Sequence, residues 1–266
     1  YARLLLMRKE TDLAKIKAVA HTFLVMDIQP TAHAPVVVSH PFTNSGFVGV
    51  RDVEGNLAIA DLLNKPEDCC LWREQIGQYI DQADSAYQVF LLLNKPYMLT
   101  FLKYTAPSLS ERDLGQILAN AWILNEMPNM DPNISKRELV SLFRSVSPGY
   151  LMDEGELRQY QELEDTVTVY RGVTSYNAKN IRALSWTLDR KTADRFAHRF
   201  GEDGTVYEAQ IRKEHILALF TGRNESEVIV DPRHLEQIME SPEPQFDMQI
   251  TCVPTVNILI DFPLSL

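Results

Sequence analysis

Three short segments in the second half of the chain hold side chains that could do chemistry. The first, Thr166–Val173, is an alternating apolar run typical of a strand, and alternation places Arg171 on its apolar face. A guanidinium on an apolar face costs free energy unless it meets a carboxylate or an anionic ligand. Gly172 follows directly and lets another chain or a ligand approach the backbone closely. A structural ion pair and an anion-binding site are both open for Arg171.

The second segment is Ser185-Trp186-Thr187, which precedes a helical pattern that we expect over Asp189–Phe200. In a strand, Ser185 and Thr187 point to the same face, so two hydroxyls lie side by side. Thr187 or Asp189 could also cap the helix, because a hydroxyl or a carboxylate accepts hydrogen bonds from free backbone N–H groups. Capping is the simpler explanation of Thr187 taken alone.

The third segment places Glu225 and Glu227 two residues apart where an apolar strand, Glu227–Val230, begins. We expect both carboxylates on one face and close together. Such a pair suits a reaction in which one carboxylate stabilises positive charge and the other orients or deprotonates a nucleophile. A solvated, charged strand edge is the structural alternative. Upstream, Phe220-Thr221-Gly222 predicts a turn that could present the Phe220 ring to a planar ligand.

In this order, the three segments resemble the R-S-E class of mono-ADP-ribosyltransferases, named for its arginine, serine and glutamate motifs. This class includes the cholera-like and clostridial binary toxins and the vertebrate ecto-enzymes. The resemblance runs from about Val167 to Leu235. It implies an α+β protein whose split β-sandwich binds NAD as co-substrate and transfers its ADP-ribose to an acceptor with release of nicotinamide. It implies no metal, because NAD carries the leaving group and the protein supplies positioning and charge.

The resemblance also implies which side chains bind NAD. Arg171 would contact the phosphates or the nicotinamide ribose, and the backbone of Gly172 would hydrogen-bond the nicotinamide amide. Ser185 would support the catalytic glutamate and the ribose. Thr187 takes the third position of a motif that reads Ser-Trp-Thr here and Ser-Thr-Ser in the family. Phe196 would pack near the nicotinamide.

The two glutamates would be catalytic. Glu227 would bond the ribose 2′-hydroxyl and stabilise the oxocarbenium charge that builds up as nicotinamide leaves. Glu225 would orient or deprotonate the acceptor, the usual arrangement where the family modifies arginine. The loop that selects the acceptor in the family precedes Glu225 and is short here. The resemblance therefore implies cleavage of NAD and transfer of ADP-ribose, and it does not identify the acceptor.

Several alternatives stay open beside a protein arginine as acceptor. The acceptor could be a base of RNA or DNA, or water, which would make the protein an NAD glycohydrolase. A catalytically silent binding module of the same fold is a further alternative. The family also suggests a toxin or a phage or defence effector that acts in the cytoplasm or is delivered into a target cell. Such a protein could have an antitoxin or inhibitor as partner.

The elements that must position these residues fall into two halves. We expect residues 1–160 to form a mainly helical region with a small β element, and residues 161–266 to form the NAD-binding catalytic domain. The acidic segment Asp153–Asp165 is the expected boundary. The predicted helices are Leu4–Val25, Cys69–Asp81, Tyr87–Asn94, Tyr97–Tyr104, Glu111–Leu124 and Lys136–Ser145. The predicted strands are Val36–Ser39, Phe47–Val53, Thr166–Val173, Thr205–Ile211, Glu227–Val230 and Thr255–Asp261.

Within the helical half, Trp122 stands near the end of a predicted helix, followed by the turn residues Pro128 and Asn129. A helix end with a turn is enough to explain this pattern. The functional alternative is that this helix helps to wall the NAD cleft.

Composition narrows the class of protein. The chain has 26 Lys and Arg against 36 Asp and Glu, a net charge of −10, which disfavours general binding to nucleic acid. Three cysteines cannot form a disulfide framework, and they favour a reducing compartment. The six histidines lack metal-ligand spacing, so we expect no metal. No apolar run approaches the ~20 residues that span a bilayer, so we expect no membrane contact. Neither common phosphate-binding glycine loop occurs, which excludes P-loop ATPases and Rossmann dehydrogenases.

Overall fold

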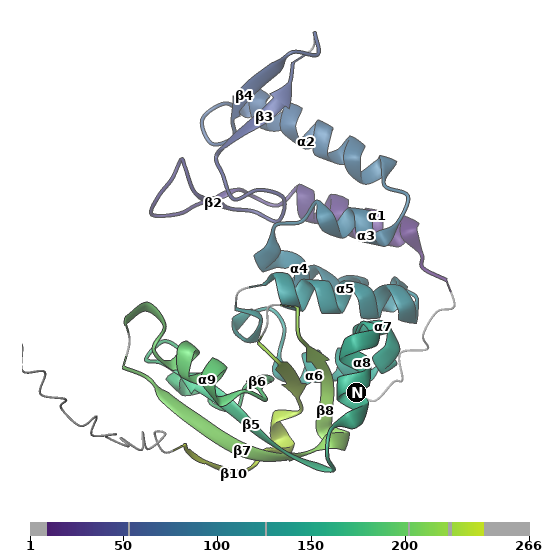
Figure 1. The fold of residues 1–266 in the computed structure, drawn as a ribbon. Helices are drawn as coiled ribbons and strands as arrows, with labels where there is room; N and C mark the ends of the chain where they lie inside the picture. Colours follow the sequence, from purple (N-terminus) through teal and green to yellow (C-terminus); the bar gives the residue numbers. More distant parts are fainter. Residues whose placement is uncertain (1–9, 53, 126, 202, 223–224, 242–266) are drawn as a thin grey trace, which may run out of the picture.

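The computed structural model describes residues 10–241, except residues 53, 126, 202 and 223–224. Within this part the protein is mixed α and β, which confirms the expected α+β class (Figure 1). The helices are α1 (Leu13–Leu24), α2 (Pro66–Gln82), α3 (Ala86–Leu91), α4 (Met98–Thr105), α5 (Glu111–Leu124), α6 (Lys136–Arg144), α7 (Pro148–Leu151), α8 (Glu154–Glu162) and α9 (Arg190–Ala197). The strands are β1 (Gln29–Pro30), β2 (Val38–Ser39), β3 (Phe47–Arg51), β4 (Leu57–Asp61), β5 (Thr166–Val173), β6 (Ser185–Thr187), β7 (Thr205–Arg212), β8 (Ile216–Phe220), β9 (Glu227–Val230) and β10 (Glu236–Glu240).

The main sheet has six strands in the order β10-β7-β5-β6-β9-β8, and every neighbouring pair is antiparallel. β5 and β7 pair along their whole length, from Thr166 opposite Arg212 to Val173 opposite Thr205. By contrast, β5 is paired with β6 at one position among the described residues, Tyr170 opposite Thr187. The sheet therefore opens between β5 and β6 into two three-stranded halves.

The helices of the first half of the chain and the sheet share one large apolar core. A large cluster of buried side chains runs from Ile16 in α1 to Leu235 before β10, and a small second cluster joins Ala193 and Ala197 of α9 to Val206 of β7. α6, α7 and α8 contact β8, and α9 contacts β5 and β7 (Figure 1). The large buried cluster includes side chains from both sides of the expected domain boundary. The division into two domains stays a prediction. In the described part of the chain, no helix is both long enough and apolar enough to span a bilayer.

The acidic segment expected as a boundary forms helix α8. Asp153 caps α8 by accepting a hydrogen bond from Glu156 N, and the Glu156 side chain accepts one from Asp153 N in return. Glu156 is buried and also accepts a hydrogen bond from Thr221 N at 2.7 Å. Asp153 and Glu156 therefore cap a helix, and Glu156 also bonds to the residue after β8, although their acidic composition is typical of a loop.

The Phe220 ring is buried, and it lines a small pocket together with Glu225 and Glu227, so its contact with a planar ligand stays a prediction. Phe220 ends strand β8 and is 3% exposed, because all five side chains of this strand are buried. The sequence pattern missed β8 since a fully buried strand does not alternate. It also missed β4 and β10.

Element ends differ from the predictions at several places. α1 begins at Leu13, where Asp12 caps it, and the part of the predicted helix before Glu10 lies outside the described residues. α9 ends at Ala197, before the predicted end at Phe200. The predicted strand Thr255–Asp261 lies outside the described residues.

His40 makes the stability of the fold sensitive to mild acid. The ring is fully buried, its Nδ1 accepts a hydrogen bond from Phe42 N at 3.1 Å, and it packs edge-on against Trp72. Burial lowers the pKa of His40 from 6.5 to about 4. The unfolded chain therefore takes up a proton near pH 6.5 while the native protein stays neutral, so stability falls as the pH falls through this window.

We expect the free energy of unfolding to fall by about 2 kcal/mol between pH ~7 and pH ~5 because of His40. Urea unfolding at both pH values measures this change. His40→Asn keeps an acceptor for Phe42 N and should remove the part of the pH dependence that His40 causes, even if the variant is less stable. An unchanged pH dependence in this variant would show that other groups cause it.

Candidate active site

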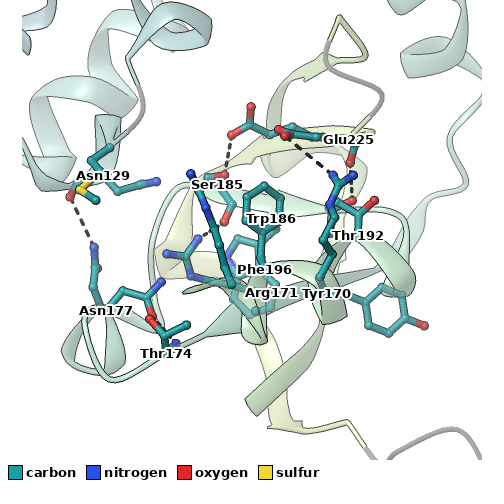
Figure 2. Close-up of a pocket in the computed structure, with 18 of the residues that line it drawn as sticks. Asn129, Tyr170, Arg171, Thr174, Asn177, Ser185, Trp186, Thr192, Phe196 and Glu225 are labelled. Carbon is teal, nitrogen blue, oxygen red and sulfur yellow. Dashed lines mark hydrogen bonds and ion pairs between the residues drawn. The ribbon is translucent and has the colours of Figure 1, made fainter. Parts of the chain in front are cut away.

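A cavity of about 550 Å³ lies where the two halves of the sheet separate (Figure 2). Its walls come from β5, β6, α9, the start of β9, residues 174–180 and residues 127–129 after α5. This volume is within the range of small-molecule sites. The cavity brings together every residue that the sequence singled out for binding or catalysis: Arg171, Gly172, Ser185, Thr187, Phe196, Glu225 and Glu227.

Glu227 is the first residue of β9 and is only 8% exposed. The Ser185 hydroxyl donates a hydrogen bond of 2.5 Å to Glu227 Oε1. The Trp122 indole Nε1–H donates to the same oxygen at 3.1 Å. Burial alone favours the neutral form of a carboxyl group, whereas donors to its oxygens favour the charged form. The arrangement thus holds a carboxylate in a fixed orientation at the cavity wall.

Arg171 extends from β5 toward β6, where its Nη1 donates to the backbone oxygen of Ser185 at 2.5 Å. Its Nε is buried and has no hydrogen-bond partner among the described residues. Burial lowers the pKa of Arg171 to about 10, while the Glu227 carboxylate acts to raise it, so the side chain stays charged at neutral pH. An unsatisfied donor on a buried cation fits a ligand with anionic or hydroxyl oxygens.

The positive field around Arg171 reaches a second cation. Burial lowers the pKa of Lys136 at the start of α6, and the positive charge of Arg171 lowers it further. The Lys136 ammonium donates to the backbone oxygen of Arg182 at 2.6 Å. An anionic group beside Arg171 would relieve this repulsion.

Phe196 on α9 forms an apolar part of the cavity wall (Figure 2). The guanidinium carbons of Arg195 and Arg199 lie 5.6 and 5.7 Å from the centre of its ring. Both arginines also line the cavity. This wall therefore offers one aromatic ring and two cations, a combination that suits a ligand with aromatic and anionic parts.

Gly172 is needed because α9 crosses β5 at this residue. A Cβ atom at position 172 would lie 2.2 Å from the Ala193 oxygen and 2.5 Å from the Ala197 nitrogen. The close approach expected at this glycine is thus made by a helix of the same chain. A backbone contact to a ligand stays a prediction.

Gly172→Ala should push α9 away from β5 and destabilise the protein by about 2 kcal/mol. It should also displace Phe196, which α9 carries at the cavity wall. Denaturant unfolding measures the loss, with Gly222→Ala as control, because a Cβ there would meet nothing within 4 Å. Equal stability of the two variants would contradict this role of Gly172.

A strained turn places Glu225 just before β9. Ser226 adopts a positive φ of 43°, a conformation that is uncommon for a residue other than glycine. Two hydrogen bonds hold this turn. The Thr187 hydroxyl at the end of β6 donates to the backbone oxygen of Glu225, and Leu188 N, just after β6, donates to the backbone oxygen of Ser226. The turn, and not strand alternation, therefore brings Glu225 to the cavity.

The Glu225 carboxylate lies 3.9 Å from the Arg195 guanidinium. The described contacts of the Thr187 hydroxyl are to backbone, since it donates to the Glu225 oxygen and accepts from Asp189 N at 3.0 Å. Asp189 caps α9 by accepting from Lys191 N and Thr192 N. A contact of Thr187 with NAD stays a prediction.

Trp122 contacts a side chain of the cavity wall, which the sequence pattern around it does not signal. α5 ends at Leu124 as predicted, so Trp122 does lie in the last turn of a helix. The indole nevertheless reaches Glu227, and Asn129 joins the cavity wall while its Oδ1 accepts from Leu184 N at 3.0 Å. No local pattern signals a contact between residues so far apart in sequence.

Among the described residues, no group of three or more His, Cys, Asp or Glu side chains could hold a metal ion. Comparison of the chain with protein-family models, with curated proteins and with solved structures finds no match.

Proposed function

We propose that this chain is a mono-ADP-ribosyltransferase, which transfers ADP-ribose from NAD to a macromolecular acceptor and releases nicotinamide. The observation that carries the proposal is the convergence of Arg171, Ser185 and Glu227 on one cavity, with Ser185 bonded to the buried Glu227 carboxylate. These are the residues of the three motifs, and they come from β5, β6 and β9. The order of the motifs in the sequence does not by itself require this contact.

The opening of the sheet between β5 and β6 supports the split β-sandwich of this class as the proposed fold. The cavity lies at this opening, where the proposal puts NAD. In the proposed complex, Arg171 binds phosphate or ribose oxygens through its unsatisfied Nε. Phe196 packs on the nicotinamide ring, and Arg195 and Arg199 add positive charge beside it.

NAD supplies a positively charged leaving group, the nicotinamide ring, on an N-glycosidic bond. As this bond breaks, its electron pair leaves with nicotinamide and positive charge builds up on the ribose. Glu227, held by Ser185 and Trp122, stabilises this charge and accepts a hydrogen bond from the 2′-hydroxyl. Glu225 accepts the proton of the acceptor nitrogen as that nitrogen bonds to the ribose carbon. Protein arginine is the favoured acceptor.

Incubation of the protein in cell lysate with NAD labelled in its adenylate part tests the proposal, with Glu227→Gln as control. If protease releases the label from macromolecules, the acceptor is a protein. If nuclease releases it, the acceptor is RNA or DNA. Free ADP-ribose as the sole labelled product identifies an NAD glycohydrolase. Unchanged NAD would overturn the proposal and favour a binding module.

A further inference from the structure

We infer that Trp122 is a positioning residue for the reaction at Glu227, an inference that rests on the proposed function. The indole lies on α5, outside the segment that carries the three motifs. It donates to Glu227 Oε1 at 3.1 Å, the oxygen to which Ser185 also donates. Trp122 has no exposed surface and does not line the cavity, so it acts through Glu227 and not on the ligand.

The packing around Trp122 fixes where its N–H points. Its ring stands edge-on to Phe143 of α6, with the ring centres 5.4 Å apart. Both side chains are buried in the shared core, so the indole has little freedom to rotate away from Glu227. A donor held in this way restricts the carboxylate more than a donor on a mobile side chain would.

A buried indole does not need a carboxylate as its partner. Trp186 is also buried, and its Nε1–H donates to the backbone oxygen of Ala183 at 3.0 Å. At Trp122 the partner is an ionised group in the cavity wall, where a hydrogen bond is stronger than one between neutral groups. The helical half of the chain thereby supplies one of the two described donors to Glu227 Oε1.

Trp122→Phe removes the N–H donor and keeps a buried ring. With one donor fewer, the charged form of Glu227 is less favoured, so its carboxyl pKa rises. The acid limb of the plot of kcat against pH should therefore move to higher pH. We expect kcat for nicotinamide release to fall about tenfold or more, the effect of losing a hydrogen bond to a charged group. The KM for NAD should stay within about twofold, because Trp122 does not line the cavity.

The experiment compares wild type, Trp122→Phe and Trp72→Phe in a nicotinamide-release assay with NAD over a range of pH. Trp72 is a matched control, since it is buried in the helical half, packs on His40 and does not line the cavity. Unfolding midpoints of all three proteins are measured in parallel. A merely structural role would lower the midpoint of Trp122→Phe without moving the acid limb.

A folded Trp122→Phe protein with the kcat and acid limb of wild type would overturn the inference. If this variant does not fold, the indole ¹⁵N–¹H signal of Trp122 is followed in the wild type, where Trp72→Phe and Trp186→Phe assign the other two indoles. A signal that titrates with the apparent pKa of the acid limb supports the inference, and one that does not overturns it. Wild-type protein that releases no nicotinamide refutes the proposed function itself, and the inference with it.

Discussion

Glu227→Gln is expected to reduce nicotinamide release and ADP-ribose transfer by about a thousandfold or more. The amide keeps the shape of the side chain, and its oxygen can still accept from Ser185 and Trp122. It lacks the negative charge that meets the positive charge on the ribose. The fold should therefore remain intact while the reaction is lost. Nicotinamide release and transfer of label measure the two activities, and unfolding curves establish that the variant is folded.

The control for this prediction is Glu236→Gln on β10, which removes an exposed carboxylate outside the cavity. It should retain full activity. Glu227→Gln protein with nicotinamide release near the wild-type rate would refute the catalytic assignment of Glu227, whatever its effect on transfer.

Glu225→Gln is expected to separate the two activities. If Glu225 takes the proton from a guanidinium acceptor, transfer to an arginine peptide should fall by about a hundredfold or more. Hydrolysis of NAD should fall far less, because Glu227 still stabilises the charge on the ribose. The ratio of peptide-bound to free ADP-ribose measures the effect.

Equal losses of transfer and hydrolysis would contradict this role and make Glu225 a structural residue of the strained turn. Ser226→Gly is the control for the turn itself, since glycine adopts a positive φ without strain. It should leave the product ratio of the wild type unchanged.

Local pattern was enough to predict the elements that carry the three motifs. The ends of β5 and β9 agree with the predicted strands, and those of α5 with the predicted helix. In β5 apolar and polar residues alternate, and α5 has a capping residue and a helical apolar period. The carboxylate of Glu227 was also placed correctly near Ser185, although that expectation came from the family resemblance and not from pattern.

The remaining features depend on contacts that are distant in sequence. The continuous apolar strand β8 carries no periodic signal, so it was not predicted as a strand. The positive φ of Ser226 follows from hydrogen bonds to Thr187 and Leu188, which no local rule supplies. The contact of Trp122 with Glu227 likewise requires the packing of α5 against the sheet.

The packing of the helices against the sheet gives the first half of the chain a part in the site. Residues 127–129 line the cavity, and α5 holds Trp122 against Glu227. The helical region is therefore expected to be required for activity, which a resemblance limited to the second half does not imply.

We propose above that the residues of this cavity cleave the nicotinamide–ribose bond of NAD. The most direct test of this proposal is chromatography of NAD incubated with the purified protein, with and without added cell lysate. We expect one nicotinamide to be released for each NAD consumed, with ADP-ribose found free or bound to an acceptor. NAD that remains intact both in buffer and in lysate, in the presence of folded protein, would contradict it.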